Sequence, residues 1–184
     1  MTDLRLTEPP AGLLLTPGAS ADRDHATLVA IDEALPEIHV ERLTLGTTSV
    51  KSAVRKIGAA VDELCATLEV GPDRLAYGGR SFGGRACSVA VAEGLPAAAL
   101  VLLSYPLHPP GKPDNLRVEH FGGIEVPSLF VSGVKDPFGT AEEFAEHTPA
   151  LGGPVRTEWV PGNHSPKGQD AAIIAYIRSF LALD

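Results

Sequence analysis

The chain has 184 residues, of which 44% are hydrophobic and 21% charged, and its 15 Lys and Arg against 23 Asp and Glu give a net charge of −8. This length predicts one domain over residues 1–184. Because the Lys and Arg are not clustered, the composition excludes the phosphate contacts of a nucleic-acid-binding protein. Residues 1–12 carry charges and two prolines, and apolar stretches such as Ala97–Leu103 are far shorter than a bilayer span. We therefore expect a cytoplasmic protein with neither a signal peptide nor a membrane partner.

Short apolar segments alternate with helical patterns along the chain, which is typical of a parallel sheet covered by helices. In chain order, the expected elements are a strand at Gly12–Thr16, a helix near Asp24–Leu35, a strand at His39–Leu45, a helix at Val50–Leu68, a strand at Arg74–Gly78, a helix at Phe82–Glu93, strands at Ala98–Tyr105 and Ser128–Val131, a helix capped by Thr140 and Glu143, a strand at Val155–Val160 and a helix at Gln169–Leu183. They predict an α/β fold with a doubly wound, mostly parallel six-stranded sheet.

The connection from Pro106 to Val126 differs from the other crossovers because it is rich in proline and contains paired glycines. We expect a loop there, with one helical turn near Leu116–His120. It is too short for a large lid, which predicts an open, shallow pocket. Long loops of this kind are usually functional, and catalytic groups of parallel sheets gather at the carboxyl ends of the strands.

Ser81 stands in a turn that has the form of a nucleophile elbow. Gly79 and Gly83 flank it at the spacing Gly-x-Ser-x-Gly, an expected strand ends just before it, and an expected helix begins just after it. The alternative is a phosphate-binding loop, but Arg85 stands where that motif needs Lys, and Ala86 where it needs Ser or Thr. The context therefore predicts a catalytic serine.

A serine nucleophile needs a base, and the base needs an acid to orient it. Asp136 follows the expected strand Ser128–Val131, and His164 follows the last expected strand, in the chain order that this fold requires. Asp114 is the weaker alternative acid because it ends no strand. Taken singly, Asp136 could be an ordinary turn residue and His164 a surface histidine. Their order and their placement after strands together predict a catalytic triad with Ser81, on a minimal α/β-hydrolase fold.

Two backbone N–H groups should stabilise the oxyanion of the reaction. We expect one from Phe82, the residue after the nucleophile, and the other from Ala19 in the loop after the first strand. Pro17 in that loop has no N–H to donate. An ordinary strand-to-helix turn is the alternative interpretation of the loop.

Further residues near the expected strand ends are candidates for a substrate pocket. These candidates are Gly18, His25, Arg80, Tyr105 and His108. His120 is a weaker candidate for the same role. No metal-ligand motif is found, so we expect neither a metal nor another cofactor.

The chain resembles the small α/β-hydrolase family that contains the third subunit of the nonspecific-lethal complex and a testis-expressed relative. The matching segments are LLTPGA (14–19), GGRSFGGR (78–85), LSYPLHPPG (103–111) and FVSGVKDPFGT (130–140). More distantly, the chain is similar to dienelactone hydrolases, which use Cys where this chain has Ser81. The resemblance implies a serine triad at Ser81, Asp136 and His164. Many relatives carry His where Pro17 stands, so the oxyanion loop is expected to differ.

These features predict a serine hydrolase acting through an acyl-enzyme on a small-molecule acyl substrate, a carboxylic ester or thioester. A non-catalytic domain that binds a ligand or a protein partner is the alternative. Acyl transfer also remains open, whereas dehalogenation would need a carboxylate at position 81. The acyl group and the oligomeric state are left open.

Overall fold

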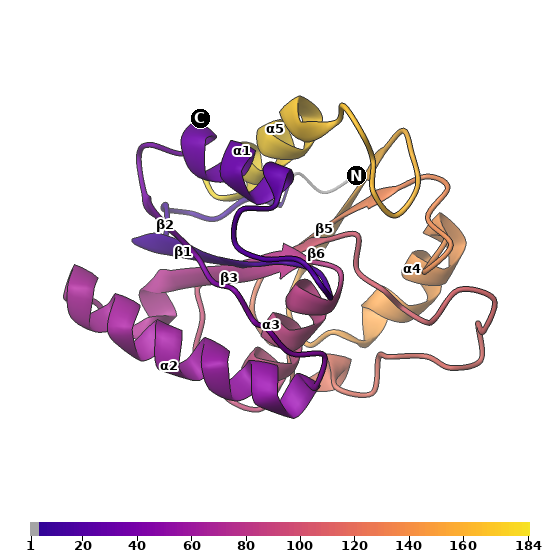
Figure 1. The fold of residues 1–184 in the computed structure, drawn as a ribbon, viewed down its shortest axis with the longest axis horizontal. Helices are drawn as coiled ribbons and strands as arrows, with labels where there is room; N and C mark the ends of the chain where they lie inside the picture. Colours follow the sequence, from indigo (N-terminus) through magenta and orange to yellow (C-terminus); the bar gives the residue numbers. More distant parts are fainter. Residues whose placement is uncertain (1–3) are drawn as a thin grey trace.

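The computed structural model describes residues 4–184, which form a six-stranded sheet with helices on both faces (Figure 1). All five strand pairs are parallel, and the strand order is β2-β1-β3-β4-β5-β6. The strands are β1 (Gly12–Thr16), β2 (His39–Arg42), β3 (Leu75–Arg80), β4 (Ala99–Leu103), β5 (Ser128–Gly133) and β6 (Val155–Val160). The expected six-stranded α/β fold is confirmed, and its sheet is wholly parallel in the described residues.

The helices divide between the two faces of the sheet. They are α1 (Ala26–Ala34), α2 (Val50–Leu68), α3 (Phe82–Ala92), α4 (Ala141–His147) and α5 (Asp170–Phe180). Figure 1 shows α1 and α5 above the sheet and α2 and α3 below it. The capping box that precedes α4 is present: the Thr140 hydroxyl accepts from the Glu143 N–H, and the Glu143 carboxylate accepts from the Thr140 N–H.

Successive side chains of each strand point to opposite faces of the sheet, so the protein has one hydrophobic core on each face. Along β1, Leu13 and Leu15 pack on the α1 and α5 side, whereas Leu14 packs with α2 and α3 on the other side. All three side chains are fully buried. A strand covered on both faces reads as a continuous apolar run, which is why this segment was recognisable from sequence.

The connection from β4 to β5 is mostly irregular. A short 3-10 helix occupies Phe121–Gly123, so the expected helical turn at Leu116–His120 is wrong. The turn forms later because Phe121 is the residue that enters the core beneath α3, where it is fully buried. Nothing in the described residues forms a large lid over the strand ends, as expected.

The order of the strands brings two loops together. The chain goes outward from β1 to β2 and then crosses back to β3 on the other side of β1. At such a switch point the loops after two neighbouring strands diverge and leave room for a ligand. Here these are the loop at Pro17–Gly18 and the turn at Ser81, which follow the paired strands β1 and β3.

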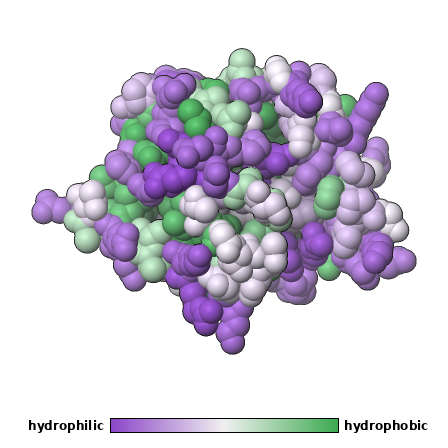
Figure 2. All heavy atoms as spheres, viewed as in Figure 1, coloured by the Kyte–Doolittle hydropathy of each residue, from purple (hydrophilic) through white to green (hydrophobic). Residues whose placement is uncertain are grey.

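The surface is mainly polar on the face that Figure 2 displays, with apolar residues concentrated on its left half. None of the helices in residues 4–184 combines the length and the apolar character needed to cross a membrane.

Candidate active site

Ser81 lies between the last residue of β3 and the first residue of α3 in a strained backbone conformation. Its φ is 51° and its ψ is −117°, a region that residues with a side chain rarely adopt and that costs about 1–3 kcal/mol. Two hydrogen bonds hold it there: the Ser81 N–H donates to the Leu103 carbonyl at 2.8 Å, and the Arg85 N–H donates to the Ser81 carbonyl at 3.0 Å.

The flanking glycines are required by close backbone contacts. A Cβ at Gly79 would lie 2.1 Å from the Thr16 carbonyl oxygen, and one at Gly83 would lie 2.3 Å from the Pro17 carbonyl oxygen. The turn therefore packs directly on the end of β1. This contact explains why the sequence needs glycine on both sides of Ser81.

The structure brings Ser81, His164 and Asp136 together in one hydrogen-bonded chain. His164 Nε2 lies 2.8 Å from Ser81 Oγ, and His164 Nδ1 lies 2.8 and 3.0 Å from the two Asp136 carboxylate oxygens. Asp136 is only 4% exposed, whereas His164 and Ser81 are half-buried and reachable from solvent. Asp114, the alternative acid, is exposed in the connection between β4 and β5.

The loops that carry the acid and the base are packed against each other. Gly133 ends β5, and a Cβ there would lie 2.3 Å from the Asn163 carbonyl oxygen. The Lys135 N–H donates to the Gly162 carbonyl at 2.9 Å, and the Phe138 N–H donates to Asp136 Oδ1 at 2.9 Å. These contacts hold the Asp136 carboxylate in line with His164.

Phe138 is a neighbour of the base that the sequence analysis missed. Its ring stacks on the His164 imidazole with the centroids 3.9 Å apart and the planes 27° apart. The stacked ring covers one face of the imidazole and restricts its orientation. The available signal was its position two residues after the acid, in the same tight turn.

The first turn of α3 presents backbone donors beside Ser81. The first N–H groups of a helix have no partner within it, and the Arg85 N–H is the first to pair, on the Ser81 carbonyl. The Phe82 N–H therefore remains available on the nucleophile side. In the loop after β1, Gly18 is the residue next to Ser81, and Ala19 is exposed. The oxyanion roles of Phe82 and Ala19 stay predictions.

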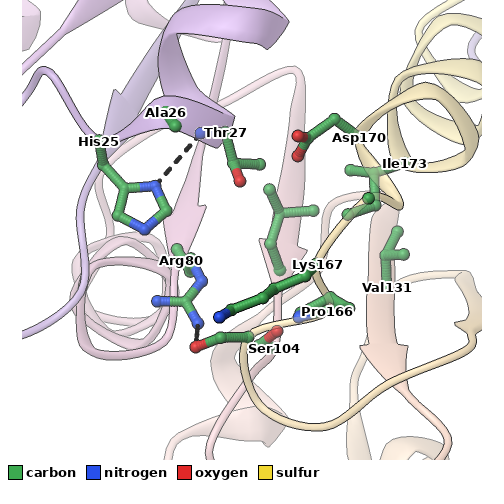
Figure 3. Close-up of a pocket in the computed structure, with 13 residues that line it drawn as sticks. His25, Ala26, Thr27, Arg80, Ser104, Val131, Pro166, Lys167, Asp170 and Ile173 are labelled. Atoms are coloured by element: carbon green, nitrogen blue, oxygen red, sulfur yellow. Dashed lines mark hydrogen bonds between the residues drawn. The ribbon is translucent and has the colours of Figure 1, made fainter.

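A cavity of about 320 Å³ opens beside Arg80, the residue before Ser81, on the α1 and α5 side of the sheet (Figure 3). Two expected pocket residues, His25 and Arg80, line it. The Arg80 guanidinium donates from Nη2 to Ser165 Oγ at 2.5 Å and to the His164 carbonyl. Thr27, Lys167 and Asp170 also line this cavity and were not expected from the sequence, since they come together only when α1 and α5 pack side by side.

Three other expected pocket residues do not line this cavity. Tyr105 belongs to the core instead: it is fully buried against Phe121 and Phe130, and its hydroxyl donates to the Arg117 carbonyl at 3.1 Å. Burial raises the pKa of this phenol well above its usual range. His108 is 5% exposed and faces α4, where its Nε2 lies 3.1 Å from Glu143 Oε1. Neither Tyr105 nor His108 lines this cavity, because the segment after β4 enters the core.

The remaining pocket candidates, Gly18 and His120, lie elsewhere in the structure. Gly18 lines a separate hollow with Ser20 and Leu45, although it also lies next to Ser81. His120 lies beneath α3, with Nε2 2.8 Å from Ser88 Oγ. Within residues 4–184, no three His, Cys, Asp or Glu side chains gather as metal ligands would.

Comparison with known families gives one match that spans most of the chain. A family model described as "Alpha/beta hydrolase domain" matches residues 9–172. The nearer kinship with the third subunit of the nonspecific-lethal complex stays a prediction.

Solved structures share this fold at low sequence identity. Est1E from Butyrivibrio proteoclasticus is 18% identical with a TM-score of 0.74, and the match covers 96% of this chain and 88% of that chain. Dienelactone hydrolase from Anabaena variabilis is 17% identical with a TM-score of 0.75, covering 97% and 88%. A cold-adapted esterase from an Arctic intertidal metagenomic library is 15% identical with a TM-score of 0.70, covering 94% and 83%. At these identities the likeness is one of fold.

Proposed function

Since this chain belongs to the alpha/beta hydrolase domain family, we propose that it is a serine hydrolase that cleaves a small carboxylic ester or thioester through an acyl-enzyme. One observation carries the proposal: His164 bridges the Ser81 hydroxyl and the buried Asp136 carboxylate with hydrogen bonds of 2.8 Å on each side. The fold shared with solved esterases supports the same class of reaction.

The proton positions follow from the chemistry of the three groups. A carboxylate only accepts hydrogen bonds, so His164 Nδ1 carries the proton that faces Asp136. Nε2 then has a free lone pair and accepts from the Ser81 hydroxyl. This arrangement prepares His164 to take the Ser81 proton as the hydroxyl oxygen attacks the substrate carbonyl carbon.

The attack makes a tetrahedral intermediate with negative charge on the former carbonyl oxygen. The Phe82 N–H, at the start of α3, is the first donor for that charge, and the Ala19 N–H is the second. His164, now protonated, donates its proton to the leaving oxygen or sulfur, and the acyl group stays on Ser81. The stacked Phe138 ring restricts the orientation of the imidazole in this step.

Water then repeats the sequence on the acyl-enzyme. His164 takes a proton from water, the hydroxide attacks the acyl carbonyl, and Ser81 leaves with the proton returned by His164. The products are a carboxylic acid and an alcohol or thiol. With no large lid in the described residues, the carbonyl of a small ester reaches Ser81 directly.

Covalent labelling tests the nucleophile. A fluorophosphonate probe should label the wild type and fail to label Ser81→Ala, because the probe needs an activated hydroxyl. Ser88→Ala is the matched control, since Ser88 also lies 2.8 Å from a histidine but is fully buried in α3. It should label like the wild type. Equal, poor labelling of wild type and Ser81→Ala contradicts the proposal and favours a non-catalytic binding domain.

A series of 4-nitrophenyl esters of increasing acyl length tests the substrate class. We expect the highest kcat/KM for short acyl groups and a loss of several orders of magnitude in Ser81→Ala. Rates near background for every ester, with labelling of Ser81 intact, would reject the esterase assignment while keeping an activated serine.

A further inference from the structure

The Arg80 guanidinium is a half-buried cation that forms no ion pair with a carboxylate of the described residues. None of the ion pairs formed within residues 4–184 includes Arg80. Its two hydrogen bonds, to the His164 carbonyl and to Ser165 Oγ, both use Nη2. The N–H groups of Nη1 and Nε therefore form no hydrogen bond with an oxygen of the described residues. Burial lowers the pKa of Arg80 from its usual value, and the charge of nearby Asp136 offsets part of that effect.

This guanidinium lies close to the nucleophile and also lines the cavity. A side chain added at Gly18 would begin 3.6 Å from Ser81 Cβ and 3.7 Å from Arg80 Nη1, so both groups border one small space. Arg80 also lines the 320 Å³ cavity. A short chain attached to the carbonyl that Ser81 attacks would therefore bring its far end to Arg80.

The rest of the cavity adds donors around the same point. In Figure 3 the Lys167 ammonium points toward the Arg80 guanidinium from the opposite wall. Lys167 likewise forms no ion pair within the described part of the chain. Lys167 is exposed and Arg80 is half-buried, and both line the same cavity, so a carboxylate bound there has two cations in its surroundings.

His25 contributes a neutral donor. Its Nδ1 accepts from the Thr27 N–H at 3.3 Å, so the proton is on Nε2, and Figure 3 shows that nitrogen on the Arg80 side of the ring. Burial and the Arg80 charge lower the pKa of His25 and keep it uncharged. Asp170 is the one acidic residue in the lining, and Figure 3 places its carboxylate away from Arg80, toward Thr27.

The floor of the cavity is apolar. Leu103, Val131 and Ile173 line it between the strand ends and α5. The cavity thus combines an apolar floor with Arg80 and Lys167 in its lining. This pattern suits a short aliphatic chain that ends in an anion.

We propose that the cavity binds a carboxylate on the acyl part of the substrate, so that the enzyme prefers half-esters or half-thioesters of short dicarboxylic acids. The proposal rests on the proposed function. Hydrolysis breaks the bond from the acyl carbon to the leaving oxygen or sulfur, water supplies the new oxygen, and the second carboxylate stays unchanged on Arg80. Arg80 and Lys167 would then determine specificity.

A matched pair of substrates tests the proposal: 4-nitrophenyl hydrogen adipate, which carries a free carboxylate, and its neutral methyl ester. The wild type should show a kcat/KM at least about tenfold higher for the charged substrate, the size of one charge-assisted hydrogen bond. Arg80→Gln should bring this ratio close to one, Arg80→Lys should keep part of it, and Lys167→Gln should lower it several-fold. Lys51→Gln, on the exposed side of α2, removes the same charge elsewhere and should keep the wild-type ratio.

The ratio of kcat/KM for the charged and the neutral substrate distinguishes two roles of Arg80: binding the substrate carboxylate and positioning His164. Arg80 also holds the His164 loop through the His164 carbonyl, so Arg80→Gln will lower kcat for both substrates. If it lowers both equally and the wild-type preference persists, Arg80 only positions the base and the proposal is overturned. A wild-type ratio near one overturns it as well.

Calorimetry gives a readout that needs no turnover. Ser81→Ala should bind monomethyl adipate and not dimethyl adipate, and adding Arg80→Gln should abolish that binding. If this binding is found while no ester is hydrolysed, the carboxylate site stands and the hydrolase proposal fails. If neutral esters are hydrolysed while Ser81→Ala binds neither adipate ester, the hydrolase proposal stands and the carboxylate site is rejected.

Discussion

The molecule contains two serine–histidine pairs with the same separation and opposite surroundings. Ser81 Oγ lies 2.8 Å from His164 Nε2, and Ser88 Oγ lies 2.8 Å from His120 Nε2. Both serines belong to the segment from the elbow into α3. The distance between the two atoms therefore says nothing by itself about catalysis.

The proton runs in opposite directions in the two pairs. Ser88 donates its hydroxyl proton to the Arg85 carbonyl at 2.8 Å, so its oxygen accepts from His120. His120 Nδ1 is buried without a partner, and burial lowers the pKa of the ring. In the other pair Asp136 accepts from Nδ1, which leaves Nε2 as the acceptor for Ser81. A base needs an acid on its other ring nitrogen, and of these two histidines only His164 has one.

The largest loss of activity is expected from removing the Asp136 carboxylate. Asp136→Asn offers an amide that can donate to Nδ1, so His164 is free to adopt the tautomer that cannot accept from Ser81. We expect kcat to fall by about 10⁴, as for the loss of an orienting carboxylate in such triads. Steady-state hydrolysis of a 4-nitrophenyl ester measures it. Asp114→Asn, in the exposed connection after β4, should keep the wild-type rate.

The two serines also differ in their backbone surroundings. Ser81 lies in a tight turn that needs glycine on both sides, whereas Ser88 lies within the regular helix α3. Gly83→Ala would place a Cβ 2.3 Å from the Pro17 carbonyl oxygen, and we expect a loss of about 1–3 kcal/mol in the free energy of unfolding, together with reduced turnover. Gly58→Ala is the matched helical control in α2. No atom lies within 4 Å of its new methyl group, so it should stabilise the protein by about 0.5–1 kcal/mol. Urea denaturation of both variants checks the contrast, and equal effects would contradict it.

Ser88→Ala should affect stability and not catalysis. It removes the partner of His120 Nε2 in a buried site, which costs about 1–2 kcal/mol. Hydrolysis and fluorophosphonate labelling should stay at wild-type levels. A large fall in labelling would mean that the two pairs are coupled.

The smallest expected effect is on the pH dependence of the free energy of unfolding. Burial lowers the pKa of His120 below that of the unfolded chain, so the unfolded state takes up a proton first as the pH falls. The stability that depends on neutral His120 is therefore complete above about pH 6.5 and is lost progressively below it. His120→Gln should flatten the dependence of unfolding free energy on pH below this value. Part of the slope should remain, because His25 is shifted in the same direction. An unchanged slope would show that His120 is not the group responsible.

Much of the fold could be predicted from local patterns. The bounds expected for the first and last strands and for the helix Val50–Leu68 match the structure, because apolar periodicity and turn residues determine them within a short segment. Strands β2 and β4 are shorter than expected, because their regular pairing with neighbouring strands ends at Arg42 and Leu103. The Thr140 capping box was readable because it involves residues only three apart.

The sequence by itself determined the elbow at Ser81 and the order in which Ser81, Asp136 and His164 follow three strands. Chain order and local turn chemistry were sufficient for that. Only the tertiary structure decided which side chains face one another across elements distant in the chain. It stacked Phe138 on His164, buried Tyr105 in the core, and placed Arg80 and Lys167 on the walls of one cavity. The physical reason is that such contacts depend on how helices and loops pack over the sheet, and no short stretch of sequence encodes that packing.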